Sequence, residues 1–286
     1  MRIGTMSILF REQNGTSEHI GYVESLQRIR RAGFEVADLN LCQLCAHKTT
    51  LHQDNWQEET EKIAEAVKTL GISLPQCHLP FKSKKVRWES PEDYAYYIKM
   101  FYRAIDVAVM LGIPWAVVHP ERSADHPGFT RAQHLAANHK EYDALVDYAL
   151  GKGLKIAFEN MRMGYGSDAK DLVELIDSFH DIRIGACWDT GHANTHYKKG
   201  DQWDALHIIG NRLHCTHIDD NRGDEDLHLL PWEGMVDWAR VIAALRDINY
   251  SGDLILEGFI NLFAPDSLKD ENGRHAFAVM SQLLTL

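Results

Sequence analysis

Acidic and histidine side chains recur in this sequence at places where a short apolar run ends. The run 184–188 stops at a predicted turn, 189–192, which carries Asp189 and, three residues later, His192. The run 212–216 stops at His217. Carboxylate and imidazole groups in such positions can bind a divalent cation or exchange protons with a substrate. A single residue of this kind is ordinarily a turn polar, but the pattern repeats along the chain. We therefore expect these residues to form a functional site.

The full series consists of histidines, aspartates and glutamates at the ends of expected strands or in the loops that follow them. In chain order they are His78, His119, Glu159, Asp189, His192, His217, Asp226, His228 and Glu257. The carboxyl ends of parallel strands face one crevice, so residues far apart in sequence would meet there. Mixed nitrogen and oxygen donors suit zinc, manganese, cobalt or iron. A cation would also allow several buried carboxylates to stay ionised together.

Glu159 and Glu257 are the strongest candidates for a catalytic role. Both follow strongly apolar runs, 156–158 and 254–256, where an unpaired carboxylate would be costly to bury. Asp189 and His217 are equally strong candidates for a functional role, and the interpretation of the remaining residues stays open at this point. His78 and His119, each taken alone, are also typical of packed histidines.

Other polar residues near the expected strand ends have supporting roles. His192, Asp226 and His228 can orient the ligands or bind substrate hydroxyls. Arg222 is either a solvated loop charge or a cation that holds a sugar oxygen or a phosphate. Three tryptophans are candidates for the apolar walls of the pocket: Trp115, Trp188 and Trp232. For Trp188, packing in the core is an equal alternative.

The segments that must position these residues alternate between strand-like and helix-like patterns. The expected strands are 2–9, 35–41, 72–79, 115–118, 154–158, 184–189, 212–217 and 253–256. Helices are expected from Ser17 or Glu18 to Gly33 and over 56–70, 91–111, 131–150, 168–179, 201–209, 236–248 and 267–284. Eight such units, with strands apolar enough to be buried on both faces, predict an α/β fold: a single (β/α)₈ TIM barrel spanning residues 1–286 as one domain. An open doubly wound sheet is the alternative, but its Gly-rich phosphate-binding turns are absent.

Composition limits the classes of partner. The formal charge of −11 argues against nucleic acid, because proteins that bind phosphate backbones usually carry a basic surface. Apolar runs fall short of the roughly 20 residues that span a bilayer, so no membrane association is expected. Strand-like sequence begins almost at Met1, which leaves no room for a signal peptide, and we expect a cytoplasmic protein.

The five cysteines do not indicate a disulfide framework, because their number is odd and the expected compartment is reducing. Cys42 and Cys45 form one CxxC motif without a second pair at zinc-ribbon spacing. We interpret them as two loop thiols. Cys77, Cys187 and Cys215 lie within apolar runs and are predicted to be small core residues.

Seven short motifs, in order and distributed over nearly the whole chain, carry a resemblance to a known family. They are Gln76-Cys77-His78, Val118-His119-Pro120, Phe158-Glu159-Asn160, Asp189-Thr190-Gly191-His192, His217-Ile218-Asp219-Asp220-Asn221, Asp226-Leu227-His228 and Leu256-Glu257-Gly258. As a set they resemble the motif series of the xylose-isomerase-like TIM barrel superfamily. That superfamily includes sugar isomerases and epimerases and, as a related branch, endonuclease IV.

The sugar isomerase and epimerase branch implies one divalent ion, such as Mn, Zn, Co or Mg, held by a Glu, an Asp, a His and a second Glu. The matching positions are Glu159, Asp189, His217 and Glu257. The resemblance implies a sugar, sugar-phosphate or polyol-derived substrate. Proton transfer would pass through a cis-enediolate, with the two glutamates as acid and base. It leaves open the sugar, the choice between epimerase and isomerase, and the oligomeric state, a homo-oligomer being one candidate.

The endonuclease branch implies up to three zinc ions, bound by all nine residues of the series above. Three departures speak against it: Met161 and Arg162 follow Asn160, Gly191 stands where the nuclease usually has Cys, and the run 228–234 resembles a sugar isomerase segment. We favour the sugar enzyme acting in carbohydrate metabolism. The nuclease and a catalytically silent sugar-binding barrel remain the alternatives.

Overall fold

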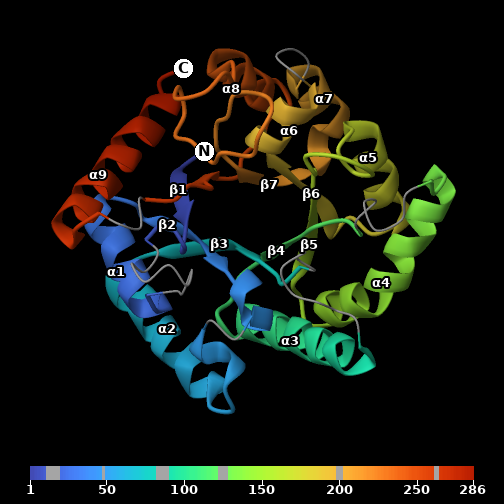
Figure 1. Ribbon diagram of the computed structural model, residues 1–286, viewed down its shortest axis with the longest axis horizontal. Coiled ribbons are helices and arrows are strands. Elements are labelled where there is room, and N and C mark those ends of the chain that lie inside the picture. Colours follow the sequence, from blue (N-terminus) through green and yellow to red (C-terminus); the bar gives the residue numbers. More distant parts are fainter. Residues whose placement is uncertain (11–19, 47–48, 82–89, 122–127, 198–201, 261–263) are drawn as a thin grey trace.

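Eight parallel strands form a nearly closed barrel in the computed structural model, which describes residues 1–10, 20–46, 49–81, 90–121, 128–197, 202–260 and 264–286 (Figure 1). The strands are β1 (Ile3–Met6), β2 (Val36–Asn40), β3 (Ser73–His78), β4 (Trp115–Val118), β5 (Lys155–Glu159), β6 (Ile184–Asp189), β7 (Leu213–His217) and β8 (Leu254–Leu256). From β1 to β7 each strand pairs with its sequence neighbours, and β8 pairs with β1. The predicted (β/α)₈ barrel is therefore confirmed.

The barrel closes between β7 and β8 through a short contact just beyond the ends of both strands. The Ile218 amide donates to the Ile255 carbonyl (2.7 Å), and the Glu257 amide donates to the Ile218 carbonyl (2.9 Å). A single parallel bridge, between Ile218 and Leu256, is recorded here. This seam places Glu257 beside the end of β7.

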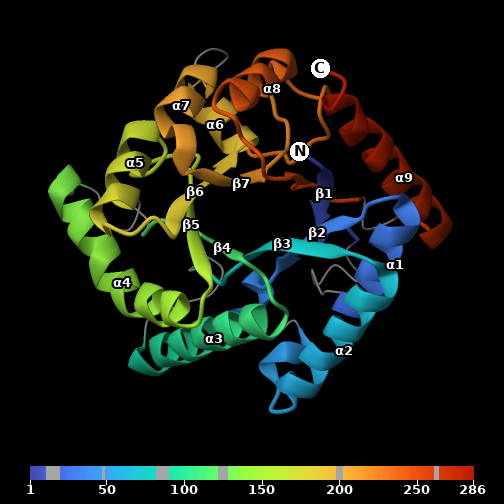
Figure 2. The same cartoon turned by 180° about the vertical axis from the view of Figure 1, so that it is seen from behind.

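Helices surround the barrel on the outside, as Figures 1 and 2 show from its two ends. They are α1 (Tyr22–Ala32), α2 (Trp56–Leu70), α3 (Pro91–Met110), α4 (Arg131–Gly151), α5 (Ala169–Ser178), α6 (Thr190–Tyr197), α7 (Gln202–Ile209), α8 (Trp238–Asp247) and α9 (Asp266–Leu283). Capping residues in the sequence determine where several of these helices begin or end. Thr130 and Gln133 form a capping box at the start of α4, and Gly71 ends α2 in the left-handed conformation.

The observed elements differ from the prediction in three places. The expected strand 2–9 is shorter, since β1 covers only Ile3–Met6. Helix α1 begins at Tyr22, whereas Ser17 and Glu18 lie outside the described residues, as does Asp201 before α7. The stretch predicted as a turn after Asp189 is instead the start of α6.

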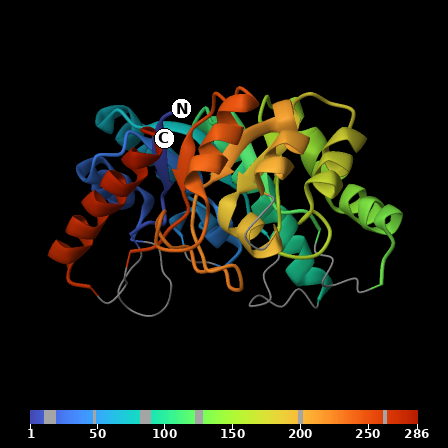
Figure 3. The same cartoon turned by 90° about the horizontal axis from the view of Figure 1, so that it is seen from above.

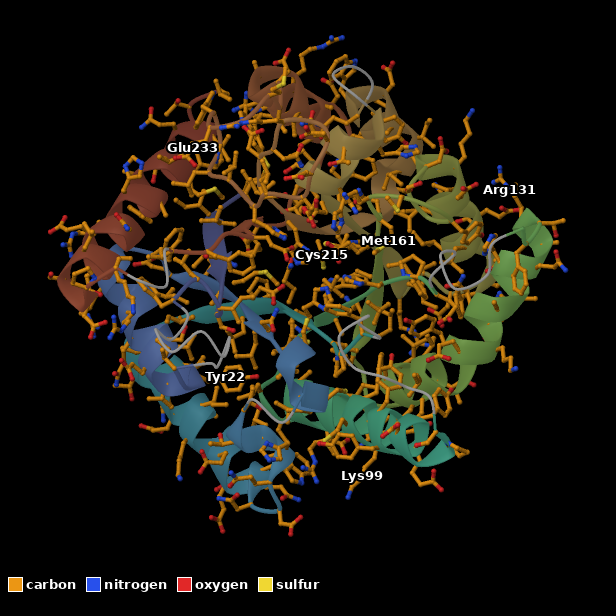
Figure 4. The ribbon with its side chains drawn as sticks, viewed as in Figure 1. Tyr22, Lys99, Arg131, Met161, Cys215 and Glu233 are labelled. Carbon is orange, nitrogen blue, oxygen red and sulfur yellow. The ribbon has the colours of Figure 1, made fainter. Side chains whose placement is uncertain are left out.

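Side chains alternate between the two faces of the strands, and this alternation separates two kinds of core. Outward-facing residues such as Leu39, Phe158 and Trp188 pack with the helices into one large apolar cluster. Two small apolar clusters lie inside the barrel: Met6, Ile8, Val36 and Ile255, and Val117, Ala157, Cys187 and Cys215. Figure 4 places Cys215 near the centre of the ring. Cys77, Cys187 and Cys215 are all buried, as predicted.

Candidate metal centre

The candidate site is built from side chains that lie two positions beyond apolar residues of the barrel interior. The successive pairs are Val117 and His119, Ala157 and Glu159, Cys187 and Asp189, Cys215 and His217, and Ile255 and Glu257. Because side chains alternate along a strand, each second member points inward at the carboxyl end of the barrel. The loop between β7 and α8, which carries further polar residues, projects at one end of the barrel in Figure 3.

Four of these side chains converge on one point. The Nδ1 atom of His217 lies 2.7 Å from Glu159 Oε1 and 3.0 Å from Glu257 Oε2. Together with Asp189, these residues offer four ligand atoms that all lie within 4.8 Å of one another. Glu159, Asp189 and His217 are buried, and the Glu257 side chain is 16% exposed. The expected grouping of these four residues is therefore present, with one member facing the mouth of the barrel.

A second group shares Glu159 with the first. Its Oε2 atom lies 3.2 Å from His78 Nε2 and 3.0 Å from His119 Nε2, and these two nitrogens are 3.0 Å apart. The other nitrogen of His78, Nδ1, faces the Leu79 carbonyl (2.8 Å) and the sulfur of Cys42 (3.0 Å). Two imidazole nitrogens therefore meet at Glu159 Oε2, so this group offers three ligand atoms, while Glu159 Oε1 belongs to the first group.

A third group lies in the loop after β7 and includes a residue that the candidate series omitted. Asp226 Oδ2 lies 3.5 Å from both His192 Nε2 and His228 Nε2, and His228 Nδ1 lies 3.7 Å from Asp219 Oδ2. Asp219, Asp226 and His228 each offer a ligand atom within 4.8 Å of the others. Asp219 follows the buried Ile218, and that apolar neighbour was the available signal for it.

The groups differ in the protonation state that their surroundings favour. Burial opposes the charged form of every carboxylate, but the neighbouring His217 holds the pKa of Glu159 well below its usual value and lowers the pKa of Glu257 to about 2. Burial raises the pKa of Asp189 to about 7; His192 opposes this rise, and Glu159 and Glu257 add to it. The same centre thus contains carboxylates biased toward opposite states.

Asp189 also organises the start of α6. Its Oδ1 atom accepts a hydrogen bond from the His192 amide (2.6 Å), which is the bond an N-cap side chain makes. Asn160 donates to the Asp189 carbonyl (3.0 Å), accepts from the Asp189 amide (2.7 Å), and its own carbonyl lies 2.9 Å from His192 Nδ1. A Cβ at Gly191 would collide with the Asp219 carboxylate, so this helical turn requires glycine.

The remaining candidates lie in different places. Arg222 is exposed on the β7–α8 loop. Of the three tryptophans expected to line the pocket, Trp188 is fully buried among outward-facing side chains, and Trp115 begins β4 at the opposite end of the barrel. Trp232 is 48% exposed in the same loop as Arg222. The expectation was therefore wrong for Trp115, and for Trp188 the alternative of core packing is confirmed.

A family model described as "Xylose isomerase-like TIM barrel" matches residues 26–276. A D-psicose 3-epimerase of Enterocloster bolteae is 25% identical over 84% of this chain and 77% of that protein. An uncharacterized protein of Methanocaldococcus jannaschii is 30% identical over 54% of each chain, and one of Sinorhizobium fredii is 26% identical over 64% of this chain. The chain spans only 54% and 59% of the lengths of these last two relatives.

Solved structures share the fold over nearly the full length. A D-psicose 3-epimerase of Clostridium cellulolyticum, solved with D-tagatose, superimposes with a TM-score of 0.74 at 14% identity and 99% coverage of both chains. A putative xylose isomerase of Rhodospirillum rubrum gives a TM-score of 0.77 at 16% identity, again over 99% of both chains. Within the described residues, every helix is too short or too polar to cross a membrane.

Proposed function

The chain belongs to the xylose isomerase-like TIM barrel family, and from this membership we propose that it is a divalent-metal-dependent epimerase or isomerase of a sugar or sugar phosphate. The observation that carries the proposal is the convergence of Glu159, Asp189, His217 and Glu257 on one point inside the barrel. The relatives named D-psicose 3-epimerase support a ketose as the substrate class.

The donor set fits a divalent cation. Asp189 Oδ2 and Glu257 Oε2 are buried oxygens without a hydrogen-bond partner in the described part of the chain; the approach of Glu257 to His217 lacks hydrogen-bond geometry. Three carboxylates and one imidazole suit manganese, zinc or cobalt, with magnesium as the harder alternative. When bound, such a cation would supply Lewis-acid stabilisation of negative charge that develops on the substrate oxygens.

The two glutamates are the proposed acid and base. Glu159 is held by His217, His78 and His119, whereas Glu257 is partly exposed at the mouth and its buried Oε2 has no hydrogen-bond partner among the described residues. One carboxylate would remove the proton from the carbon beside the substrate carbonyl, giving a cis-enediolate, and the other would return a proton. Return to the opposite face of the same carbon is epimerisation, and return to the neighbouring carbon is isomerisation. Alignment must supply much of the rate, because both groups are weak bases.

Residues around the mouth would orient the substrate. His192 is fixed by the Asn160 carbonyl on one side and faces Asp226 on the other, so it can donate to a substrate hydroxyl or to a developing oxyanion. Asp226 and His228 can accept or donate similar bonds. Arg222 is exposed close to them in sequence and would hold a sugar oxygen or a phosphate.

Solvent deuterium exchange into a ketose tests the proposal. D-psicose, D-tagatose and D-fructose, incubated with manganese-loaded protein in D₂O, should gain deuterium at the carbon next to the carbonyl. Glu159→Gln and Glu257→Gln should each abolish the exchange. Glu225→Gln, a matched change at an exposed glutamate in the β7–α8 loop, should leave it unchanged. Full exchange in either of the first two variants would reject the two-carboxylate scheme.

A second candidate function is a trinuclear zinc nuclease that cleaves abasic sites. The observation in its favour is that the His78 group and the Asp226 group flank the first group, so three sets of ligand atoms are available. Elemental analysis distinguishes the candidates, because the sugar enzyme requires one metal per chain and the nuclease about three. Cleavage of an abasic duplex, together with three metals, would favour the nuclease.

A further inference from the structure

One more carboxylate, that of Asp38, lies in the barrel interior next to the candidate ligands. Asp38 is on β2, two positions after the interior residue Val36, and its side chain is fully buried. A buried charge is costly unless a partner compensates it. Its Oδ1 atom has no hydrogen-bond partner among the described residues. Asp38 therefore needs an explanation that packing alone does not provide.

The other oxygen of Asp38 faces the imidazole of His217. The distance between Asp38 Oδ2 and His217 Nε2 is 3.4 Å. The opposite ring nitrogen, Nδ1, is the atom that lies 2.7 Å from Glu159 and 3.0 Å from Glu257. The two nitrogens of one ring thus face two different surroundings: Nδ1 faces the converging ligand atoms, and Nε2 faces a single carboxylate.

Gln76 on β3 holds Asp38 in this position. Its Nε2 atom donates to Asp38 Oδ2 (2.8 Å) and also lies 3.4 Å from the carbonyl of Thr216, the residue immediately before His217. Gln76 is 2% exposed, so water does not compete freely for these bonds. One amide group therefore links the carboxylate on β2 to the backbone of β7. The separation of Asp38 and His217 is fixed by three strands of the barrel.

We propose that Asp38 is a positioning residue for the metal centre: it accepts the Nε2 proton of His217 and so leaves Nδ1 free to bind the cation. The inference rests on the proposed function, because it assumes a cation at the point where the four ligands converge. An imidazole that binds a metal through one nitrogen carries its proton on the other, and an acceptor there fixes both the tautomer and the ring orientation. A carboxylate acceptor also makes the imidazole a stronger ligand.

Cys187 is a competing neighbour of His217 in the interior, since its sulfur belongs to a group with Glu159 and His217. A thiol is a weak hydrogen-bond acceptor. The carboxylate of Asp38 is the stronger acceptor. The role therefore falls to Asp38, with Gln76 as its support.

Metal affinity tests the proposal without relying on activity. The dissociation constant for manganese or zinc is measured by competition with a chromophoric chelator in the wild type, Asp38→Asn and Gln76→Met. Asp38→Asn should weaken binding about 10- to 100-fold, the effect usual for a group behind a metal-bound histidine. Gln76→Met should weaken it less. At saturating metal, Asp38→Asn should recover most of its kcat, because the substituted residue does not touch the substrate.

Asp253→Asn is the matched control. Asp253 is also a mostly buried aspartate, but it pairs with Arg2 at the other end of the barrel, so its replacement should leave the metal dissociation constant within about twofold. Melting temperatures of the metal-free proteins show whether each variant folds. Gln76→Met keeps the test valid if Asp38→Asn does not fold, because the same loss of support should then appear in that variant.

NMR of the zinc-loaded, ¹⁵N-labelled wild type gives an independent readout. The His217 proton should reside on Nε2, identified by the loss of its signal in His217→Gln. A proton on Nδ1, or an unchanged affinity in Asp38→Asn, would overturn the inference while the metal centre stands. Asp38-dependent metal binding without any ketose exchange would support the inference and reject the proposed reaction. A wild type that binds no divalent cation would reject both.

Discussion

Both ends of the barrel are rich in polar side chains, but the two ends differ in how completely the described side chains are paired with one another. At the amino ends of the strands, Arg2 Nη2 lies 2.6 Å from Asp253 Oδ2. The ammonium group of Lys155 lies 5.1 Å from the ring centre of Trp115, and His214 stacks on the same ring at 4.1 Å. A cavity of about 420 Å³ also opens at this end, lined by Ile182 and His214 among others.

At the carboxyl ends, the buried carboxylates converge without enough donors to satisfy them. In the part of the chain that the structure describes, Asp189 Oδ2, Asp219 Oδ2 and Glu257 Oε2 have no hydrogen-bond partner. Polar side chains and a cavity are thus also present at the end that lacks the converging carboxylates. The two ends differ in their buried carboxylate oxygens: those at the carboxyl end lack hydrogen-bond donors, and a bound cation would compensate their charge.

Two histidines of β7 test this difference between the two ends, and we expect the largest effect on metal affinity from them. His217 faces the carboxylates, whereas His214, three residues earlier, stacks on Trp115. His217→Ala should raise the metal dissociation constant by more than about 100-fold, beyond what groups behind a ligand cause. His214→Ala should leave it within about twofold. Similar affinities in the two variants, measured by chelator competition, would remove the distinction between the two ends.

Two adjacent aspartates in the β7–α8 loop, Asp219 and Asp220, also differ in how many hydrogen bonds their carboxylates accept. Asp220 accepts hydrogen bonds from the amides of Asn221, Trp232, Met235 and Val236 and from the Trp238 indole, whereas Asp219 Oδ2 has no partner within the described ranges.

Asp220→Asn should lower the free energy of unfolding by about 2–4 kcal/mol, because an amide cannot replace a carboxylate among so many donors. Asp219→Asn should change the stability of the metal-free protein little, since burial and the nearby Asp189 raise the pKa of Asp219 and favour its neutral form. Urea unfolding without metal compares the two variants. Equal losses would show that the unpartnered oxygen is not a distinguishing feature.

The pH dependence of stability provides a third test, of intermediate size. The pKa of Asp189 is about 7 in the folded protein, against an ordinary value of 3.8, so the metal-free folded state holds more protons than the unfolded state between these values. Stability should therefore fall as pH rises from about 4 to about 7, on the order of 2 kcal/mol or a few degrees in Tm.

Metal removes this dependence, because a ligated Asp189 no longer binds the proton. The Tm of the metal-saturated protein should accordingly separate from that of the chelator-treated protein as pH increases through this range. A constant difference between the two curves would argue against Asp189 as a ligand. The Asp189→Asn variant, treated with chelator, should show a smaller pH dependence than the chelator-treated wild type.

The smallest expected effect is at the amino end. Arg2 is 58% exposed while it pairs with Asp253, so the ion pair is well screened by solvent. Arg2→Met should lower the free energy of unfolding by about 1 kcal/mol or less and leave the metal affinity unchanged. Any measurable loss of metal affinity in this variant would show that the two ends are coupled.

The barrel and the series of acidic and histidine residues at its strand ends could be predicted from the sequence, because both depend on local patterns. The selection of four of these residues as one ligand group rested on the family resemblance. Buried parallel strands are short apolar runs, and a carboxylate or histidine two positions after an interior residue must face inward. The four residues Glu159, Asp189, His217 and Glu257 satisfy that rule. The start of α6 was missed because Asp189-Thr190-Gly191 also reads as a turn, and only the bond from the His192 amide distinguishes an N-cap.

Other parts of the site depend on contacts that sequence does not contain. Asp219 and Asp220 are both aspartates and have nearly the same sequence neighbours. Only the folded loop shows that Asp220 accepts hydrogen bonds from five donors. Asp38 is a different case. It lies in an apolar strand, as Glu159 does, so the argument that singled out Glu159 also applied to it. What sequence could not supply was its partner, because His217 is 179 residues away.

The seam between β7 and β8 has a mechanical consequence for the whole barrel. Elsewhere neighbouring strands are joined along their length, but here the described residues record one bridge, at Ile218 and Leu256. His217 and Glu257 come from opposite sides of that joint. A cation held by both would connect β7 and β8, the two ends of the paired sheet, at the place where backbone pairing is sparsest. Local opening of the barrel, and with it the amide hydrogen exchange of β8, would then report directly on occupancy of the site.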